Sequence, residues 1–238
     1  MLSQNPHLKI SIIIPVLNEA STIASVISTA QKAKNIEIIV ADGGSSDGTA
    51  EIATSLGVRV ISTAPGRAAQ MNAGAAAATG DILLFLHADT HLPPGYDSGA
   101  RLALAKPSAV AGAYALKIDA RSLCLRLVEI GVNWRSRFLQ MPYGDQAIFL
   151  SSATFDKIGG FPDLPLMEDF EFVRRLKKQG CIEIVPQPVV TSARRWQQLG
   201  IVKTTAINQI VIIAYLLGVS PDRLVFWYKR QKKNSSEN

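Results

Sequence analysis

Short apolar runs alternate with helix-like patterns along the first third of the chain. Four runs are rich in β-branched residues and typical of buried strands: residues 10–14, 36–41, 58–61 and 82–86. Between the first two runs, apolar residues recur every three or four positions from Ile23 to Ala30, and Asn18 is placed to cap that helix. Alternating strands and helices predict a parallel sheet with crossover helices, so we expect an α/β fold class.

Polar and glycine-rich residues separate these elements. The stretch from Asp42 to Gly48 ends the second strand as a loop, and a helix then begins at Thr49 and ends near Gly57. An alanine-rich helix is expected near residues 70–78, and an amphipathic helix begins at the acidic pair 168–169. These helices would cover the faces of the sheet.

Length and composition suggest one domain with an appended tail. The chain has 238 residues, of which 47% are hydrophobic, enough for one substantial core. We therefore expect a single domain over residues 1–197 and a C-terminal helical tail over residues 198–238. The apolar run at residues 10–14 is too short for a signal peptide, so secretion is not expected. Cys124 and Cys181 lack a paired spacing, which gives no support for disulfides or zinc and fits a cytoplasmic protein.

The formal net charge of +6 is concentrated near the C-terminus. Four of the five residues 229–233 are basic and follow the aromatic residues 226–228, whereas basic residues elsewhere are scattered among acids. This distribution predicts no nucleic-acid partner. Residues 206–217 are apolar but too few to span a membrane. Either they pack on the domain, or they lie at the inner face of the cell membrane with the aromatic and basic ending as an anchor.

Polar side chains follow three of the predicted strands. They are Pro15, Asn18 and Glu19 after the first, Asp42 after the second, and His87 and Asp89 after the strand at residues 82–86. Ligands of open α/β sheets bind at this edge. The P-loop and G-x-G-x-x-G motifs are absent, which disfavours a P-loop phosphotransferase and an ordinary dinucleotide dehydrogenase. A carboxylate at this edge can instead hold a divalent cation that neutralises a diphosphate, and Asp89 is so placed.

An ordered series of motifs runs from about residue 11 to residue 196. In chain order they are SIIIPVLNEASTI, IIVADGGSSDGT, GRAAQMN, LLFLHADT, GDQAIFLSSATFDKIGGFPDLPLMEDFEFVRRL and TSARRW. Together they resemble the family 2 glycosyltransferases of the GT-A fold. That resemblance implies a Rossmann-like nucleotide-binding mixed sheet flanked by helices. It also implies an inverting transfer of one sugar from a nucleotide-diphosphate sugar, expected to be a UDP-sugar, to an acceptor hydroxyl.

The resemblance also assigns roles to individual residues. Donor contacts are implied for Pro15, Asn18, Glu19, Asp42, Gly43, Arg67, Asn72 and His87. Asp89 matches the last aspartate of the family's D-x-D motif, which binds Mn²⁺ or Mg²⁺ on the diphosphate. His87 stands where the motif has its first aspartate and brings no negative charge.

The remaining roles concern catalysis. Asp169 matches the D of the family's ED pair and is implied as the general base, with Glu168 in support. Arg195 and Trp196 belong to TSARRW, a variant of the Q-x-x-R-W box, and Arg195 would stabilise the departing diphosphate together with the metal. Ser192 replaces the glutamine of that box, which favours a single transfer over polymer synthesis.

Each of these residues also fits a purely structural role. The acidic pair 168–169 could simply complement the dipole of a helix with basic last turns. Asp42 could shape a glycine-rich turn, and His87 could be a structural histidine at a strand end. Arg195 could be a solvated cation and Trp196 a core residue.

Two further functional classes stay open beside the glycosyltransferase. One is a nucleotidyltransferase, although residues 15–19 replace the Gly- and Arg-rich loop that this class needs. The other is a non-catalytic module that binds sugar nucleotides. The acceptor is not defined, and an apolar or lipid-linked acceptor is one alternative. Residues 121–141 could form its binding loop or lid, or only a helix and connector.

Overall fold

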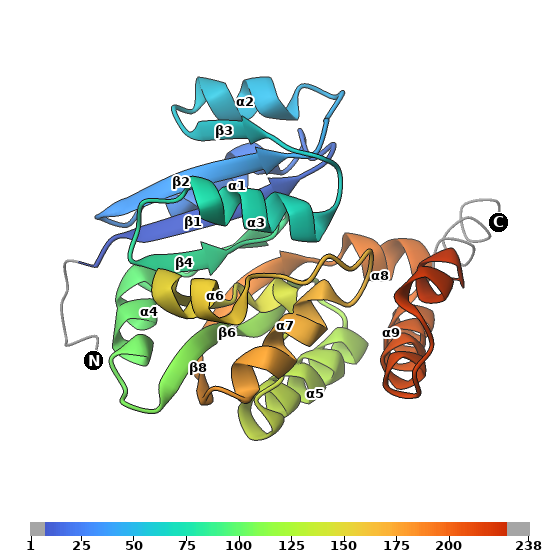
Figure 1. Ribbon diagram of the computed structural model, residues 1–238. Helices are drawn as coiled ribbons and strands as arrows, with labels where there is room; N and C mark the ends of the chain where they lie inside the picture. The colour runs from blue at the N-terminus through green and yellow to red at the C-terminus, as the bar shows by residue number, and fades with distance from the viewer. Residues whose placement is uncertain (1–7, 228–238) are drawn as a thin grey trace.

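The computed structural model describes residues 8–227. Its eight strands form one sheet in the order β3-β2-β1-β4-β7-β6-β8-β5 (Figure 1). The strands are β1 (Ile10–Val16), β2 (Ile36–Asp42), β3 (Arg59–Ser62), β4 (Ile82–Phe85), β5 (Thr90–His91), β6 (Ala109–Asp119), β7 (Phe149–Ser151) and β8 (Cys181–Ser192). The four strands predicted from apolar runs correspond to β1 to β4, and the α/β class is confirmed.

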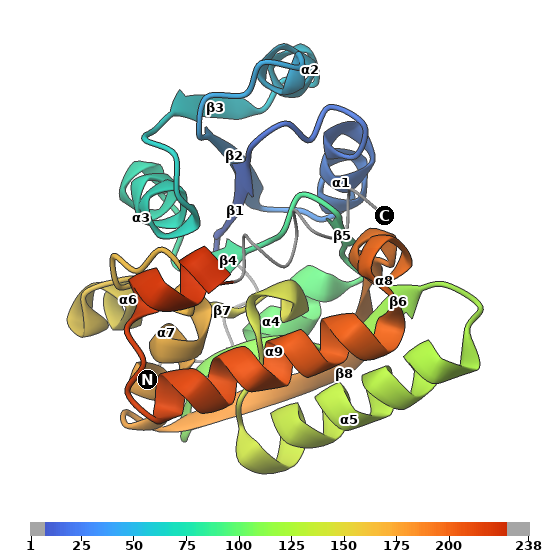
Figure 2. The same cartoon turned by 90° about the vertical axis from the view of Figure 1, so that its right-hand side faces the viewer.

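Helices cover both faces of this sheet. They are α1 (Ile23–Ala30), α2 (Thr49–Ser55), α3 (Arg67–Ala77), α4 (Tyr96–Leu104), α5 (Leu123–Leu139), α6 (Ser152–Ile158), α7 (Glu168–Lys177), α8 (Arg194–Leu199) and α9 (Ile201–Leu216), with a 3₁₀ helix η1 (Gly144–Gln146). One core contains apolar side chains of α1, α4 and α5, and a second contains those of α3, α6 and α7. Figure 2 shows the two groups on opposite sides of β1 and β4.

The sheet has a parallel half and a mixed half. Strands β1, β2, β3 and β4 are mutually parallel, so the carboxyl ends of β1, β2 and β4 lie at one edge. The mixed half begins where β7 pairs antiparallel with β4. The buried Gln70 of α3 donates from Nε2 to the carbonyl oxygens of Val16 and Ala41, at 2.6 and 2.8 Å, and so ties the ends of β1 and β2 together.

The prediction that Asn18 caps the first helix is wrong. Strand β1 extends to Val16, and α1 begins only at Ile23 with Thr22 as its N-cap. Asn18 lies in the intervening loop with a φ of 56°, a left-handed conformation that asparagine tolerates better than most residues. Its side-chain oxygen accepts a hydrogen bond from the backbone of Ser46, which joins the loops after β1 and β2.

The described part of the C-terminal region packs on the rest of the protein. Ile207 and Val211 of α9 form a small apolar cluster with Met167 and Phe170 at the start of α7. In the part of the chain that the structure describes, no helix is long and apolar enough to cross a membrane. The basic residues 229–233 lie outside the described residues.

Candidate active site

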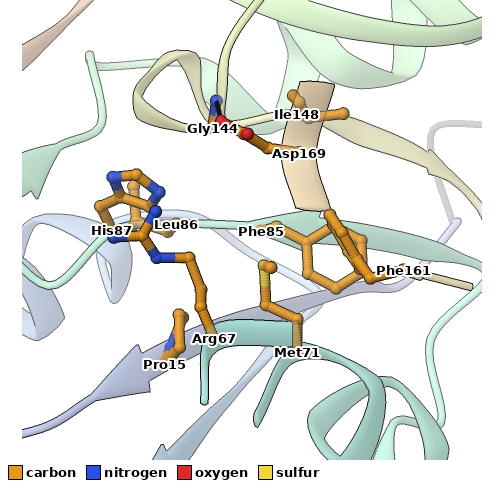
Figure 3. A pocket seen from close by; sticks show the side chains of 10 residues that line it. All are labelled: Pro15, Arg67, Met71, Phe85, Leu86, His87, Gly144, Ile148, Phe161 and Asp169. Carbon is orange, nitrogen blue, oxygen red and sulfur yellow. Dashed lines mark hydrogen bonds between the residues drawn. The ribbon is translucent and has the colours of Figure 1, made fainter. Parts of the chain in front are cut away.

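A narrow pocket lies at the carboxyl ends of β1 and β4, against α3, η1 and α7. Four residues implied by the family resemblance line it: Pro15, Arg67, His87 and Asp169 (Figure 3). Its interior of about 10 Å³ is the space of a single water molecule. A ligand as large as a nucleotide sugar would therefore have to bind at its mouth or widen it.

Asp169 is held rigidly at the first turn of α7. The backbone N–H of Phe170 donates to its Oδ1 at 2.7 Å, and the backbone N–H of Gly144 donates to its Oδ2 at 2.9 Å. Each carboxylate oxygen retains a lone pair, so the group can still accept a proton from a hydroxyl in the pocket. This geometry is suited to a general base.

Glu168 is buried and paired with Arg67, a residue of the pocket lining. Its Oε1 lies 3.3 Å from Nη1 of Arg67, which joins α7 to α3. Burial raises the pKa of Glu168 and the neighbouring Asp169 raises it further, while Arg67 opposes both. Glu168 thus has a charged partner in Arg67.

His87 is neutral at physiological pH. Burial lowers the pKa of its imidazole to about 3, and the charge of Arg67 contributes. A Cβ atom on Gly144 would lie 2.9 Å from Nε2 of His87 and 3.1 Å from Oδ2 of Asp169. Gly144 therefore passes in close contact with both side chains, and a neutral imidazole faces the pocket beside the candidate base.

Asp89 lies in a charged cluster outside the pocket lining. Nη2 of Arg194 is 3.0 Å from both carboxylate oxygens of Glu19 and 3.9 Å from Oδ2 of Asp89. Burial raises the pKa of Asp89, the charge of Glu19 raises it further, and Arg194 lowers it. Arg194, which the sequence did not single out, thus offsets part of the negative charge of the two carboxylates.

The cluster fits a cation that arrives with its substrate. Mg²⁺ commonly takes one or two protein carboxylates and completes its shell with phosphate oxygens and water. The negative field that Glu19 adds at Asp89 favours such an ion. Within residues 8–227, no three His, Cys, Asp or Glu side chains gather into a cage. A cation bound at Asp89 would therefore take most of its coordinating oxygens from a diphosphate and water.

The loop after β2 is preformed by its own hydrogen bonds. The buried carboxylate of Asp42 accepts from the backbone N–H of Gly44 and from both the N–H and the hydroxyl of Ser45. A Cβ on Gly43 would lie 3.0 Å from Nε2 of Gln70, so the loop passes directly over α3. Through these hydrogen bonds Asp42 stabilises the turn in the absence of any ligand.

Three other predicted site residues are engaged away from the pocket lining. The amide of Asn72 exchanges two hydrogen bonds with the backbone of Phe161. Arg195 donates from Nη2 to Oδ1 of Asn208 on α9 at 2.8 Å. Trp196 is half-buried and packs against the main core.

Asp145 and Arg135 are additional charged residues at the site. The pKa of Asp145 is raised to about 6, chiefly by burial, which Arg135 opposes; the charges of Asp169 and Asp89 also act to raise it. The guanidinium carbon of Arg135 lies 3.3 Å from the centre of the Tyr143 ring. Asp145 belongs to the Gly-Asp-Gln segment that precedes a strand and begins one of the family-like motifs. The sequence alone predicts no role for its carboxylate.

A comparison with protein families decides the class. The profile described as Glycosyl transferase family 2 matches residues 11–154. The chain belongs to glycosyl transferase family 2. The match covers the three strand ends but stops before Asp169, so the carboxylates of α7 lie beyond it.

Solved structures show that this family 2 glycosyltransferase has the GT-A fold. A mannosyltransferase from Pyrobaculum calidifontis in complex with GDP-Man and Mn²⁺ is 16% identical, with a TM-score of 0.65 over 98% of this chain and 75% of that one. Glucosyl-3-phosphoglycerate synthase from Mycobacterium tuberculosis, with Mn²⁺, UDP and phosphoglyceric acid, is 20% identical, with a TM-score of 0.62 over 91% and 81%. S. aureus TarS with UDP-GlcNAc is 17% identical, with a TM-score of 0.63 over 78% of this chain and 58% of that one. A comparison with curated protein sequences finds no match.

Proposed function

We propose that this glycosyltransferase moves one sugar from a nucleotide-diphosphate sugar to an acceptor hydroxyl with inversion at the anomeric carbon. The observation that carries the proposal is the fixed carboxylate of Asp169, which shares a pocket with Arg67 and His87 at the ends of β1 and β4. Donor and acceptor would therefore meet at the edge where β4 pairs with β7.

In the proposed reaction, Asp169 takes the proton of the acceptor hydroxyl. The acceptor oxygen forms a bond to the anomeric carbon while the bond from that carbon to the diphosphate oxygen breaks. Asp89 would hold Mn²⁺ or Mg²⁺, which when bound supplies positive charge to the leaving diphosphate. Arg194 and Arg67 lie close enough to Asp89 to affect its pKa and would add to that charge.

For the donor we propose a UDP-sugar. The loops after β1 and β2 carry the donor residues implied by the family resemblance, and they are joined by the Asn18–Ser46 hydrogen bond into one preformed surface. Two of the similar structures carry a uridine nucleotide and one carries GDP-Man. A GDP-sugar is therefore the alternative donor to test beside UDP-sugars.

Thermal unfolding with a nucleotide panel tests this function. UDP, GDP, UDP-glucose, UDP-GlcNAc and GDP-mannose are each added with and without Mn²⁺. A ligand at 100 times its Kd stabilises the folded state by about 2.7 kcal/mol, which for a chain of this length raises Tm by roughly 5–10 °C. We expect the largest shift with a UDP-sugar and Mn²⁺. If no nucleotide shifts Tm, the proposal is refuted. If a nucleotide sugar binds but no nucleoside diphosphate is released from it, the protein is a non-catalytic binding module.

One side of the molecule has an exposed apolar surface that fits a membrane. On α5, Leu123, Leu127, Ile130, Trp134 and Phe138 recur at helical spacing and are 55–83% exposed. The neighbouring α9 exposes Val202, Ile210, Ile213 and Leu216, and Leu217 directly after it is also exposed. Figure 2 shows the two helices running beside each other along one side of the molecule.

The charged residues around this α5–α9 surface favour an anionic partner. The only acidic residue of α5, Glu129, is buried, and α9 has none, while Arg121, Arg137 and Lys203 are exposed around the surface. We therefore propose contact with an anionic membrane surface, which attracts basic residues and accepts apolar side chains. A lipid-linked acceptor would be reached from this side.

Flotation with liposomes tests the membrane contact. The protein should float with vesicles of phosphatidylcholine and phosphatidylglycerol at low salt but not with phosphatidylcholine alone. The double variant Leu127→Ser/Trp134→Ser should lose this binding. Leu102→Ser, which changes a 66% exposed leucine on α4, should keep it. Absence of flotation, or flotation that the double variant retains, contradicts the proposal.

A further inference from the structure

The backbone at Asp145 is held on both sides. The N–H of Gly144 donates to Asp169 at 2.9 Å. The side chain of Gln146 is fully buried: its Nε2 donates to the carbonyl oxygen of Tyr114 at 2.8 Å, and its Oε1 accepts from the hydroxyl of Ser136 at 2.7 Å. The short helix η1 therefore presents the carboxylate of Asp145 from a rigid base.

One oxygen of that carboxylate has no hydrogen-bond donor. Oδ1 of Asp145 is buried, and no donor among the described residues reaches it. Buried polar atoms nearly always have a partner, so an exception has a physical cause to be found. Arg135 supplies a compensating charge, but its Nε and Nη2 donate to Met141 and Gln146. This acceptor atom therefore suits a donor that comes with a ligand.

The position of Asp145 restricts which ligand this is. The adjacent residue Gly144 donates from its N–H to Oδ2 of Asp169 at 2.9 Å, which places Asp145 next to the candidate base. Its charge also interacts with that of Asp89. In an inverting transfer, the acceptor and the departing diphosphate are on opposite sides of the anomeric carbon. Because Asp169 marks the acceptor side and Asp89 the diphosphate side, the transferred sugar ring lies between them.

We propose that Asp145 binds the transferred sugar by accepting a hydrogen bond from one of its hydroxyl groups. This inference rests on the proposed function and deepens it. A hydroxyl supplies the missing O–H donor without adding charge beside Arg135. Since a site built around such a bond leaves its buried acceptor unpaired with a deoxy analogue, Asp145 would select sugars that carry the hydroxyl.

Calorimetric titration of Asp145→Ala tests this inference. The ligands are the nucleotide sugar that gives the largest thermal shift and the matching nucleoside diphosphate, both with Mn²⁺. A hydrogen bond to a charged group corresponds to roughly a 10- to 100-fold change in affinity. We expect that loss for the nucleotide sugar and no change for the diphosphate, which lacks the sugar.

Two further variants separate binding from folding. Asp145→Asn keeps the shape and one oxygen, so it should bind the nucleotide sugar more weakly than the unsubstituted protein and more tightly than Asp145→Ala. Asp156→Asn, at an exposed carboxylate on α6, should bind both ligands normally. Unchanged affinity of the Asp145 variants for the nucleotide sugar would overturn the inference, and so would equal losses for both ligands. If the unsubstituted protein binds no nucleotide sugar, the proposed function itself fails.

Discussion

Replacing Gly144 by alanine should damage the reaction centre more than the fold. The new Cβ would lie 2.9 Å from Nε2 of His87 and 3.1 Å from Oδ2 of Asp169, whereas ordinary contacts begin at 3.4 Å. At least one of these side chains, or the loop itself, must move by up to about half an ångström. The hydrogen bond from the Gly144 N–H to Asp169 would be strained at the same time.

The expected magnitudes follow from these contacts. Overpacking of this size destabilises by about 1–3 kcal/mol, which lowers Tm by roughly 2–12 °C for a chain of this length. A misplacement of about 1 Å costs roughly 100-fold in rate, so half of that should lower kcat by about 10-fold or more. The apparent affinity for the nucleoside diphosphate should change little, because the loops after β1 and β2 are untouched.

Donor hydrolysis and thermal unfolding measure both effects. Gly131→Ala is the matched control, because its Cβ would meet nothing within 4 Å and it lies inside α5. That variant should gain about 0.5–1 kcal/mol from helix propensity and keep normal turnover. If Gly144→Ala turns over its donor at the normal rate, the close packing of Gly144 on His87 and Asp169 does not matter for the reaction.

Three further substitutions have distinct signatures. Asp169→Asn should retain nucleotide binding and lose transfer, as measured by calorimetry and product formation. Gln70→Ala removes two buried hydrogen bonds that join β1 to β2 and should cost about 2–3 kcal/mol in urea unfolding. Burial of Glu37 raises its pKa, but hydrogen bonds from Ser11, Thr79 and Lys9 outweigh this and lower the pKa to about 2. The folded state should therefore lose about 1–2 kcal/mol, after screening, as pH falls from 4.5 towards 2, and Glu37→Gln should lose less.

Each of these has a contradicting result. Full transfer activity of Asp169→Asn would mean that Asp169 is not the general base. Weakened nucleotide binding by this variant would mean that Asp169 contacts the donor instead. A Gln70→Ala protein as stable as the unsubstituted one would mean that the strand ends do not depend on this amide. Parallel pH profiles for Glu37→Gln and the unsubstituted protein between pH 5 and 3 would show that Glu37 is not the titrating group.

Sequence patterns predicted β1, β2 and β4 of the parallel half because these strands are largely buried on both faces. Such strands read as continuous apolar runs, as β1 does. The patterns did not predict β6 or β8. Strand β8 is partly exposed and contains Pro186 and Pro188, and its pairing with β6 is irregular at that point. Pairing between segments distant in sequence, rather than local pattern, forms this half.

The difference between local sequence pattern and long-range contacts also applies to the site. Residues at strand ends, such as Asp42 and Asp89, could be located because parallel strands end at one edge. The roles of adjacent Arg194 and Arg195 could not, because their directions depend on how α8 docks. The structure turns Arg194 toward Glu19 and Asp89, and Arg195 toward Asn208.

The division of the sheet also has a consequence for folding. Local connections build β1 to β4, but the site depends on contacts between distant parts of the chain. Arg67 and Glu168 are 101 positions apart, and Glu19 and Arg194 are 175 apart. Contacts that close long loops carry a larger entropic cost and tend to form late. An intermediate with only the first four strands would have the donor loops but no base, so transfer activity would appear only when folding is complete.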